Sequence, residues 1–171
     1  MAPHTKILVS SCLMGFPVRY NASAKLFMPP ALLRWQQEGR LVLCCPEVSA
    51  GFPTPRLSAE IRIAPLGERT VVESNSHDVT SGYLAGAHIA LQLALQHQCR
   101  FALLTDGSPS CGSSQIYDGS FSGKRIAGMG LTTSLLRENG ITVFGESEFS
   151  ALKRQFISRI CKRPSKRPFS R

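Results

Sequence analysis

The protein has 171 residues, of which 43% are hydrophobic and 18% are charged, and its formal net charge at pH 7 is +9. This length suits a single domain, and the hydrophobic content excludes a wholly disordered chain. No apolar stretch approaches the roughly 20 residues that a membrane-crossing helix needs, and the N-terminal residues lack the apolar region and cleavage site of a secretory signal. We therefore expect a globular protein that lies in the cytoplasm and makes no membrane contact.

The positive charge is concentrated near the C-terminus. Residues 1–150 contain 12 Lys and Arg and 11 Asp and Glu, whereas residues 151–171 contain 8 Lys and Arg and no acidic residue. We therefore predict one domain over residues 1–161 and a basic, disordered tail over residues 162–171. Because the charge belongs to the tail, any contact with nucleic acid is expected there and not on the folded domain.

Runs of Ile, Leu and Val predict buried strands, and apolar residues at helical spacing predict helices. In chain order, the expected elements are a strand at 6–11, a helix at 30–38, a strand at 41–45, a hairpin of 61–64 and 70–73, a helix at 80–98, a strand at 101–105, a helix at 131–139, a strand at 141–145 and a helix at 146–161. The helix at 80–98 has few polar positions, so we expect it to be a buried crossover.

Uninterrupted apolar strands that alternate with helices are typical of a parallel sheet covered on both faces. The hairpin is the exception, and we expect it at one edge of the sheet. The glycine-rich stretch at 122–130 lacks the spacing of a phosphate-binding loop and predicts a plain turn. The sequence therefore predicts a single-domain, Rossmann-like α/β fold with a mostly parallel sheet, helices on both faces and a small edge hairpin.

Three of the six cysteines follow predicted strands. Cys12, Cys45 and Cys111 lie at or after the carboxyl ends of three strands, where ligands bind in open α/β sheets. Cys44 precedes Cys45 in the same strand, so its side chain points to the opposite face and we assign it to the core. The alternative for all of these cysteines is that they are inert buried thiols.

The spacing of the cysteines restricts the kind of site that they can form. No Cys-x-x-Cys pair is present, which disfavours a zinc finger and a thioredoxin-type dithiol. Without a secretory signal, thiols or metal ligands are expected instead of disulfides. Three soft thiolates fit an iron–sulfur cluster, and a cluster with three cysteine ligands leaves one iron open to substrate.

In order and spacing, the chain resembles the thiouracil desulfidase family over about residues 6–148, in the segments ILVSSCLMGFPVRY, LCCPEVSAGFPTPRLSAEI, DVT and SPSCGSSQIYDGSFSGKRIAGMGLTTSLLRENGITVFGE. The resemblance implies a 4Fe-4S cluster held by Cys12, Cys45 and Cys111. It also implies catalytic roles for Glu47, in the Cys-Pro-Glu motif, and for Ser108. The chain departs from the family pattern at Asn21-Ala22 and at Ser49-Ala50, and we expect these departures to change the shape of the pocket.

The function implied by the resemblance is the non-redox desulfuration of a thiolated pyrimidine such as 2-thiouracil. The open iron acts as a Lewis acid on the thiocarbonyl group, water attacks, and hydrogen sulfide and the oxo base leave. Glu47 is expected to move the proton of the water, and Ser108 to position substrate or nucleophile. The alternative for Glu47 is a helix-capping or salt-bridging acid.

Two other functions are compatible with the sequence. The basic tail favours an RNA-associated module that binds thiolated tRNA or acts on it, with affinity from phosphate contacts and little sequence readout. A structural zinc protein or a sulfur carrier is the other alternative, and iron and sulfide analysis distinguishes it from the desulfidase. Arg19 and Arg56 lie in motif loops, where each is expected either to bind an anionic or carbonyl group or to form a salt bridge.

Overall fold

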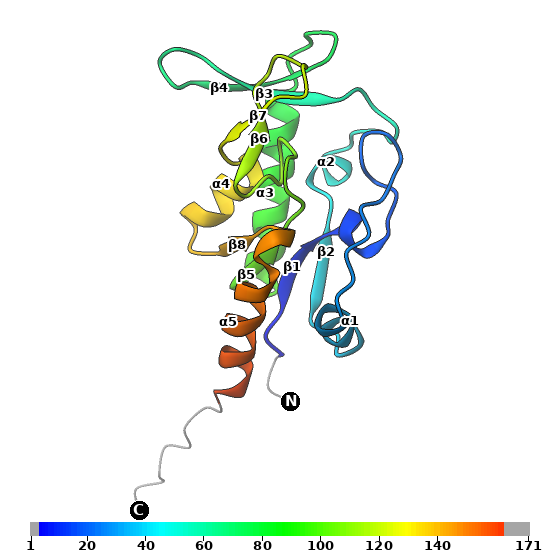
Figure 1. The fold of residues 1–171 in the computed structure, drawn as a ribbon, viewed down its shortest axis with the longest axis vertical. Helices are drawn as coiled ribbons and strands as arrows, with labels where there is room; N and C mark the ends of the chain where they lie inside the picture. The colour runs from blue at the N-terminus through cyan, green and yellow to red at the C-terminus, as the bar shows by residue number, and fades with distance from the viewer. Residues whose placement is uncertain (1–3, 163–171) are drawn as a thin grey trace, which may run out of the picture.

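The computed structural model describes residues 4–162, so almost all of the predicted basic tail lies outside the described residues. A four-stranded sheet forms its centre, in the order β2-β1-β5-β8 (Figure 1). All neighbouring strands are parallel. The strands are β1 (Ile7–Ser10), β2 (Leu41–Cys44), β5 (Phe101–Leu103) and β8 (Thr142–Phe144). These are the four strands that the apolar runs predict.

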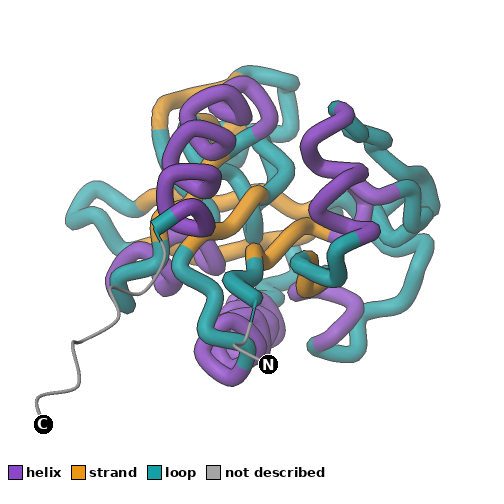
Figure 2. The backbone as a smooth tube through the Cα atoms, turned by 90° about the horizontal axis from the view of Figure 1, so that it is seen from below, coloured by secondary structure: helices purple, strands orange, loops and turns teal. Residues whose placement is uncertain are grey.

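Helices cover both faces of this sheet (Figure 2). On one face α1 (Pro30–Gln37) and α5 (Phe149–Cys161) contribute Trp35 and Phe156, which pack in one cluster with Ile7 of β1. On the other face α3 (Thr80–Gln96) and α4 (Leu131–Glu138) pack against Leu8, the next residue of the same strand. Successive strand side chains point to opposite faces, so one apolar run supplies both halves of the core. The α/β prediction is confirmed.

Helix α3 differs from the buried crossover that the sequence predicts. Apart from Tyr83, its buried residues are small, among them Ala87, Ala90 and Ala94. Leu84 and Leu95 on its outer face are 43% and 55% exposed. Gly86 is also buried, and a Cβ atom there would lie 2.4 Å from the carbonyl oxygen of Pro46. The small residues therefore allow α3 to pack closely against the rest of the protein, while the large apolar residues of its outer face lie at the protein surface.

Two antiparallel hairpins lie beside the main sheet. The predicted one pairs β3 (Ala59–Ile63) with β4 (Arg69–Glu73) and forms a two-stranded sheet of its own. The second pairs β6 (Gln115–Tyr117) with β7 (Arg125–Ala127), so the expectation of a plain turn over 122–130 is wrong at β7. Strands of three residues are too short to produce a recognisable alternation of apolar and polar residues.

The strand order places a change of direction at β1. From β1 the chain moves outward to β2 on one side, and it then returns to form β5 on the other side. The carboxyl ends of these strands therefore open into a crevice, as in other open α/β sheets. The segments that follow them there are the 3-10 turn η1 (Ser11–Met14), the short helix α2 (Pro46–Ser49) and the loop after β5. None of the helices in residues 4–162 is long and apolar enough to cross a membrane.

Candidate active site

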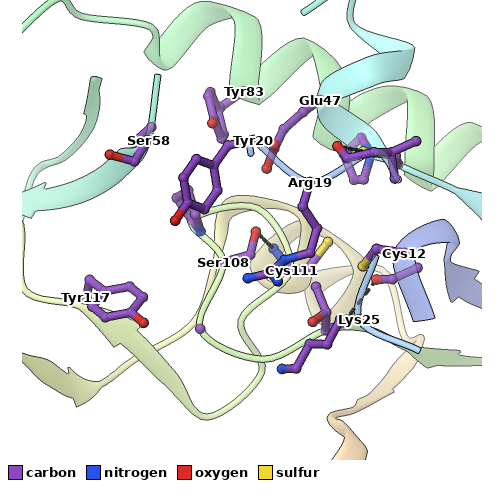
Figure 3. A pocket seen from close by; sticks show the side chains of 18 of the residues that line it. Cys12, Arg19, Tyr20, Lys25, Glu47, Ser58, Tyr83, Ser108, Cys111 and Tyr117 are labelled. Carbon is purple, nitrogen blue, oxygen red and sulfur yellow. Dashed lines mark hydrogen bonds between the residues drawn. The ribbon is translucent and has the colours of Figure 1, made fainter. Parts of the chain in front are cut away.

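A cavity of about 580 Å³ lies at the carboxyl ends of the strands. All five residues that the sequence analysis assigns to the site line it: Cys12, Glu47, Ser108 and Cys111, which Figure 3 labels, and Cys45. The cavity extends from the loops after β1, β2 and β5 to the two hairpins, which contribute further lining residues. The fold therefore brings together residues that are up to 99 positions apart in the chain.

Each of the three cysteines is placed by the end of a strand. Cys12 lies in η1 directly after β1, Cys45 occupies the N-cap position of α2 after β2, and Cys111 lies in the loop after β5. Cys12 and Cys111 are buried and Cys45 is half-buried. The sulfur atoms of Cys12 and Cys111 lie near one another in Figure 3. The thiols interact electrostatically, because negative charge on Cys45 raises the pKa of both Cys12 and Cys111.

Burial controls the ionisation of these thiols. It raises the pKa of Cys12 to about 11 and also raises the pKa of Cys45, while it raises that of Cys111 well above the ordinary value. Hydroxyl groups act in the opposite direction, since a hydrogen bond with Thr105 lowers the pKa of Cys12 and one with Ser10 lowers that of Cys111. Burial therefore favours the neutral form of the three thiols. The hydroxyl groups of Thr105 and Ser10 favour the thiolate form of Cys12 and Cys111, respectively.

Glu47 lies in the first turn of α2, where Pro46 occupies the first helical position. Its Oε2 atom pairs with Nη2 of Arg56, and its Oε1 atom accepts a hydrogen bond of 3.0 Å from the hydroxyl of Ser110. The side chain of Arg56 is only 4% exposed, and it also donates to the carbonyl oxygen of Val18 at 3.0 Å. The salt bridge that was the alternative for Glu47 is thus present, and the same carboxylate lines the cavity.

Ser108 is fixed by the backbone of its own loop. Its Oγ atom accepts hydrogen bonds from the N–H groups of Ser110 at 3.1 Å and of Cys111 at 3.2 Å. A hydroxyl whose oxygen is engaged in this way keeps its hydrogen for a further acceptor. Close packing holds the loop in place, because a Cβ atom on Gly130 would lie 2.3 Å from the carbonyl oxygen of Ser110.

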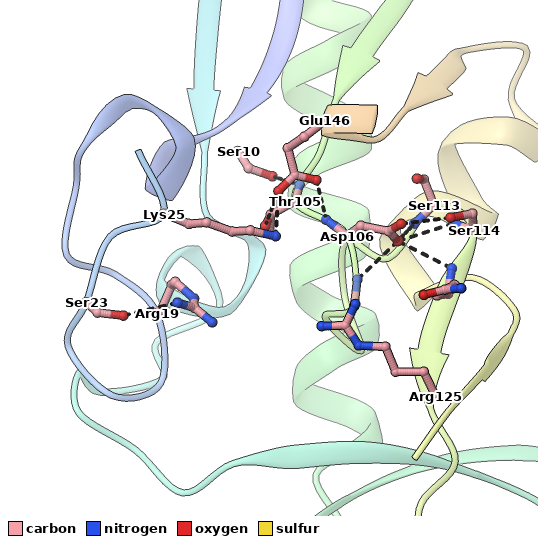
Figure 4. Close-up of polar contacts among 12 residues, drawn as sticks. Ser10, Arg19, Ser23, Lys25, Thr105, Asp106, Ser113, Ser114, Arg125 and Glu146 are labelled. Atoms are coloured by element: carbon pink, nitrogen blue, oxygen red, sulfur yellow. Dashed lines mark hydrogen bonds and ion pairs between the residues drawn. The ribbon is translucent and has the colours of Figure 1, made fainter. Parts of the chain in front are cut away.

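A polar cluster at the rim of the cavity anchors the loop that carries Ser108 and Cys111 (Figure 4). Glu146 forms an ion pair of 2.6 Å with Lys25 and accepts the N–H of Asp106 at 2.9 Å. The Asp106 carboxylate in turn accepts four bonds from residues 113–115: the backbone N–H groups of Ser113, Ser114 and Gln115 and the hydroxyl of Ser114. These bonds tie both ends of the loop to one carboxylate.

Residues 7–148 match the sequence profile of the family described as 2-thiouracil desulfurase. The chain belongs to this family. It is 41% identical over 150 residues to the protein YbbK of Bacillus subtilis (strain 168), a match that covers 84% of this chain and 97% of YbbK. It is also similar to the solved structure of the 4Fe-4S-dependent thiouracil desulfidase TudS, with a TM-score of 0.85 and 45% identity over 91% of this chain and 99% of that one. The resemblance predicted from the sequence is therefore confirmed.

The donor set of this desulfurase-family cavity fits an iron–sulfur cluster. Its soft ligands are thiols, and no histidine lines the cavity within the described part of the chain. Among residues 4–162, no group of three or more His, Cys, Asp or Glu side chains is arranged to hold a single metal ion. In a cluster each thiolate binds a different iron, so the three sulfur atoms need not converge on one point. The arrangement therefore fits a cluster better than a single zinc ion.

Of the three remaining cysteines, only Cys44 also lines the cavity. Cys44 is buried, and its sulfur lies 3.9 Å from Oγ of Ser49. Cys99 is buried in the core under α3, and Cys161 is exposed at the end of α5. The assignment of Cys44 to the core agrees with its contacts, which are with the cluster on the α3 face of the sheet.

The sequence analysis does not assign several residues that the structure places in or next to the site. Ser110 does not line the cavity, but it is buried and its hydroxyl donates to Glu47, 63 positions away in the chain. Tyr83 enters from α3, and Glu60 from the start of β3, one residue before the predicted hairpin begins. Helix α2 had a usable signal, because Pro46 and Glu47 are residue types that favour the first turn of a helix.

Proposed function

We propose that this protein converts a thiolated pyrimidine such as 2-thiouracil to the oxo base and releases hydrogen sulfide, and that it depends on a 4Fe-4S cluster. The observation that carries the proposal is that Cys12, Cys45 and Cys111 and the Glu47 carboxylate line one cavity at the carboxyl ends of the sheet. Membership in the 2-thiouracil desulfurase family and similarity to a protein named as a thiouracil desulfidase support it.

Cys12, Cys45 and Cys111 are the residues that would hold the cluster. When bound, the cluster supplies an iron that has no protein ligand and acts as a Lewis acid, which draws electrons from the thiocarbonyl group. The hydroxyl groups of Thr105 and Ser10, which lower the pKa of Cys12 and Cys111, stabilise the thiolate form that iron requires.

Glu47 is positioned to accept a proton from the attacking water. The ion pair with Arg56 fixes its Oε2 atom, so the carboxylate has a defined orientation in the wall of the cavity. A carboxylate oxygen accepts more than one hydrogen bond, so Oε1 can bind water while it accepts the bond from Ser110. The reaction needs no electrons from outside, because water supplies the oxygen of the product and its two protons leave with the sulfur.

Ser108 is positioned to donate a hydrogen bond into the cavity. Its oxygen is held by two backbone N–H groups, so its hydrogen has a defined set of directions. The acceptor would be a carbonyl oxygen of the substrate or the attacking water. Hydroxyl donation to either one lowers the barrier through positioning and charge stabilisation.

The proposal is tested with protein that is purified without oxygen. Iron and acid-labile sulfide are measured together with zinc, and 2-thiouracil is then added while uracil and hydrogen sulfide are followed. We expect iron and sulfide in the proportion of a 4Fe-4S cluster, and equal amounts of uracil and hydrogen sulfide. Zinc in place of iron, or loaded protein that releases no hydrogen sulfide, would contradict the proposal.

We further infer that the protein works in the cytoplasm. All six of its cysteines are free, and Cys161 is exposed to solvent. Free thiols and a cluster with an open iron are suited to a reducing compartment. The partner is then a small thiolated nucleobase, and the basic tail is not required for its conversion.

A further inference from the structure

A second carboxylate, that of Glu60, lines the same cavity. Glu60 lies in β3, opposite Val72 of β4, and is 8% exposed. Burying an ionised carboxylate is costly unless hydrogen bonds or a cation compensate it. Nothing in the reaction proposed above uses this residue, so its place in the wall of the cavity requires an explanation.

One oxygen of Glu60 is fixed by the turn between β6 and β7. Its Oε2 atom accepts the N–H of Gly119 at 2.9 Å and the N–H of Phe121 at 3.1 Å. Both donors have left-handed backbone, with φ of 87° at Gly119 and 58° at Phe121, a conformation that is unfavourable for phenylalanine. The two converging N–H groups fix the direction of the carboxylate.

The other oxygen of Glu60 is available. Among residues 4–162, Oε1 has no hydrogen-bond partner, and Glu60 forms no ion pair. Oε1 is also not fully enclosed by protein atoms. Glu60 thus lines the cavity with a carboxylate whose Oε1 atom has no partner among the described residues and can accept a hydrogen bond.

Resting on the function proposed above, we propose that Oε1 of Glu60 accepts a hydrogen bond from the ring N–H next to the thiocarbonyl group of the substrate. The thiocarbonyl carbon of 2-thiouracil is flanked by two ring nitrogens that carry hydrogen, and an acceptor-only carboxylate matches such a donor. Glu60 is thereby the residue that selects cyclic thioamides with a free N–H and disfavours analogues in which that nitrogen is alkylated.

Glu60→Gln reverses the polarity of the open position. The amide oxygen can still accept the N–H groups of Gly119 and Phe121, which leaves an NH₂ donor facing the donor of the substrate. We expect the dissociation constant of the product uracil, measured by calorimetry, to rise about 10- to 100-fold, with a similar fall in kcat/KM for 2-thiouracil and no change in iron content. Glu68→Gln, in the exposed turn of the same hairpin, is the matched control and should behave like the wild type.

Methylated substrates test the same hydrogen bond by removing the N–H donor of the substrate. For the wild type, either 1-methyl- or 3-methyl-2-thiouracil should lose about tenfold or more in kcat/KM, and Glu60→Gln should not reduce turnover of that same analogue further. Equal loss on all three substrates would assign Glu60 a structural role and overturn the inference, as would unchanged uracil binding. If Glu60→Gln does not fold, undiminished turnover of both methylated analogues by the wild type overturns the inference.

Loaded wild-type protein that leaves 2-thiouracil intact refutes the proposed function instead, and uracil binding then decides the role of Glu60.

Discussion

Glu47 and Arg56 form an ion pair in the wall of the cavity, and the guanidinium that holds the carboxylate is itself almost completely buried. Arg56 also reaches the carbonyl oxygen of Val18 in the loop after η1. It therefore connects two of the loops that form the site. A buried charge pair of this kind is costly to break, because removing one partner leaves the other uncompensated.

The first prediction concerns the proton chemistry of Glu47. Glu47→Gln keeps the shape of the side chain and can still accept hydrogen bonds, but it cannot take up a proton at neutral pH. The variant should be less stable, because the buried guanidinium of Arg56 loses its charged partner. In folded protein we expect iron content, the cluster spectrum and uracil binding near those of the wild type, while turnover of 2-thiouracil falls by about two to four orders of magnitude. Near-normal turnover in a fully loaded variant would leave the ion pair with Arg56 as the only role of Glu47.

The second prediction concerns the serine that holds the other oxygen of Glu47. Ser110→Ala removes the 3.0 Å hydrogen bond to Oε1, so the carboxylate is less firmly oriented. We expect kcat to fall about tenfold while KM and iron content stay near the wild type. The control is Ser113→Ala, because the buried hydroxyl of Ser113 has no hydrogen-bond partner among the described residues. Equal effects of the two changes would show that Ser110 contributes only to packing.

The sequence predicts the central sheet and its helices because their signals are local. Apolar runs such as that of Ile7–Ser10 need no knowledge of the rest of the chain. The β6–β7 hairpin and the four-residue helix α2 are too short for hydrophobic periodicity, and they form because the surrounding loops pack against them. Helix α3 was expected to be more deeply buried, since composition does not distinguish apolar residues that face the sheet from those at the surface.

The site is predictable to the extent that strand ends determine it. Cys12, Cys45 and Cys111 follow strands whose parallel arrangement brings their carboxyl ends together. The contacts that orient Glu47 depend on tertiary structure, because Ser110 lies 63 positions away in the chain. The position of Glu60 depends on the pairing of β3 with β4 and on the turn that supplies its N–H donors.

The third prediction separates cluster ligands from other cysteines. Alanine in place of Cys12, Cys45 or Cys111 should abolish or strongly reduce iron loading, because two thiolates leave two irons without a protein ligand. Cys99→Ala and Cys161→Ala should load normally, since one thiol lies in the core and the other at the end of α5. Iron per chain after anaerobic reconstitution measures the difference. A Cys111→Ala protein that loads fully, or a Cys161→Ala protein that does not, would contradict the ligand assignment.

The fourth prediction concerns the basic tail. Removal of residues 162–171 takes away five of the 20 Lys and Arg residues and no residue that lines the cavity in the described structure. We expect kcat/KM for free 2-thiouracil to stay within about twofold of the full-length value, because surface changes outside a site have small effects. Binding to tRNA is measured in parallel at two salt concentrations. Salt-dependent binding that disappears on truncation would favour the RNA-associated function.

The last prediction follows from the buried thiol of Cys99, which is 4% exposed. Burial raises the pKa of this thiol from 9.0 to about 11, although the charge of Lys6 acts against it. A group whose pKa is higher in the folded protein contributes its full stability below the unfolded pKa, and that contribution is lost as the pH rises toward the folded value.

The free energy of unfolding of cluster-free protein should therefore fall between pH 9 and about pH 11. The part that Cys99 contributes cannot exceed about 1.4 kcal/mol per pH unit. Cys99→Ala lacks this thiol, so its stability should fall less steeply than that of the wild type over the same interval, while the other buried thiols contribute equally to both proteins. Urea unfolding at pH 8, 9, 10 and 11 measures both slopes, and parallel curves would mean that Cys99 ionises as easily in the folded protein as in the unfolded chain.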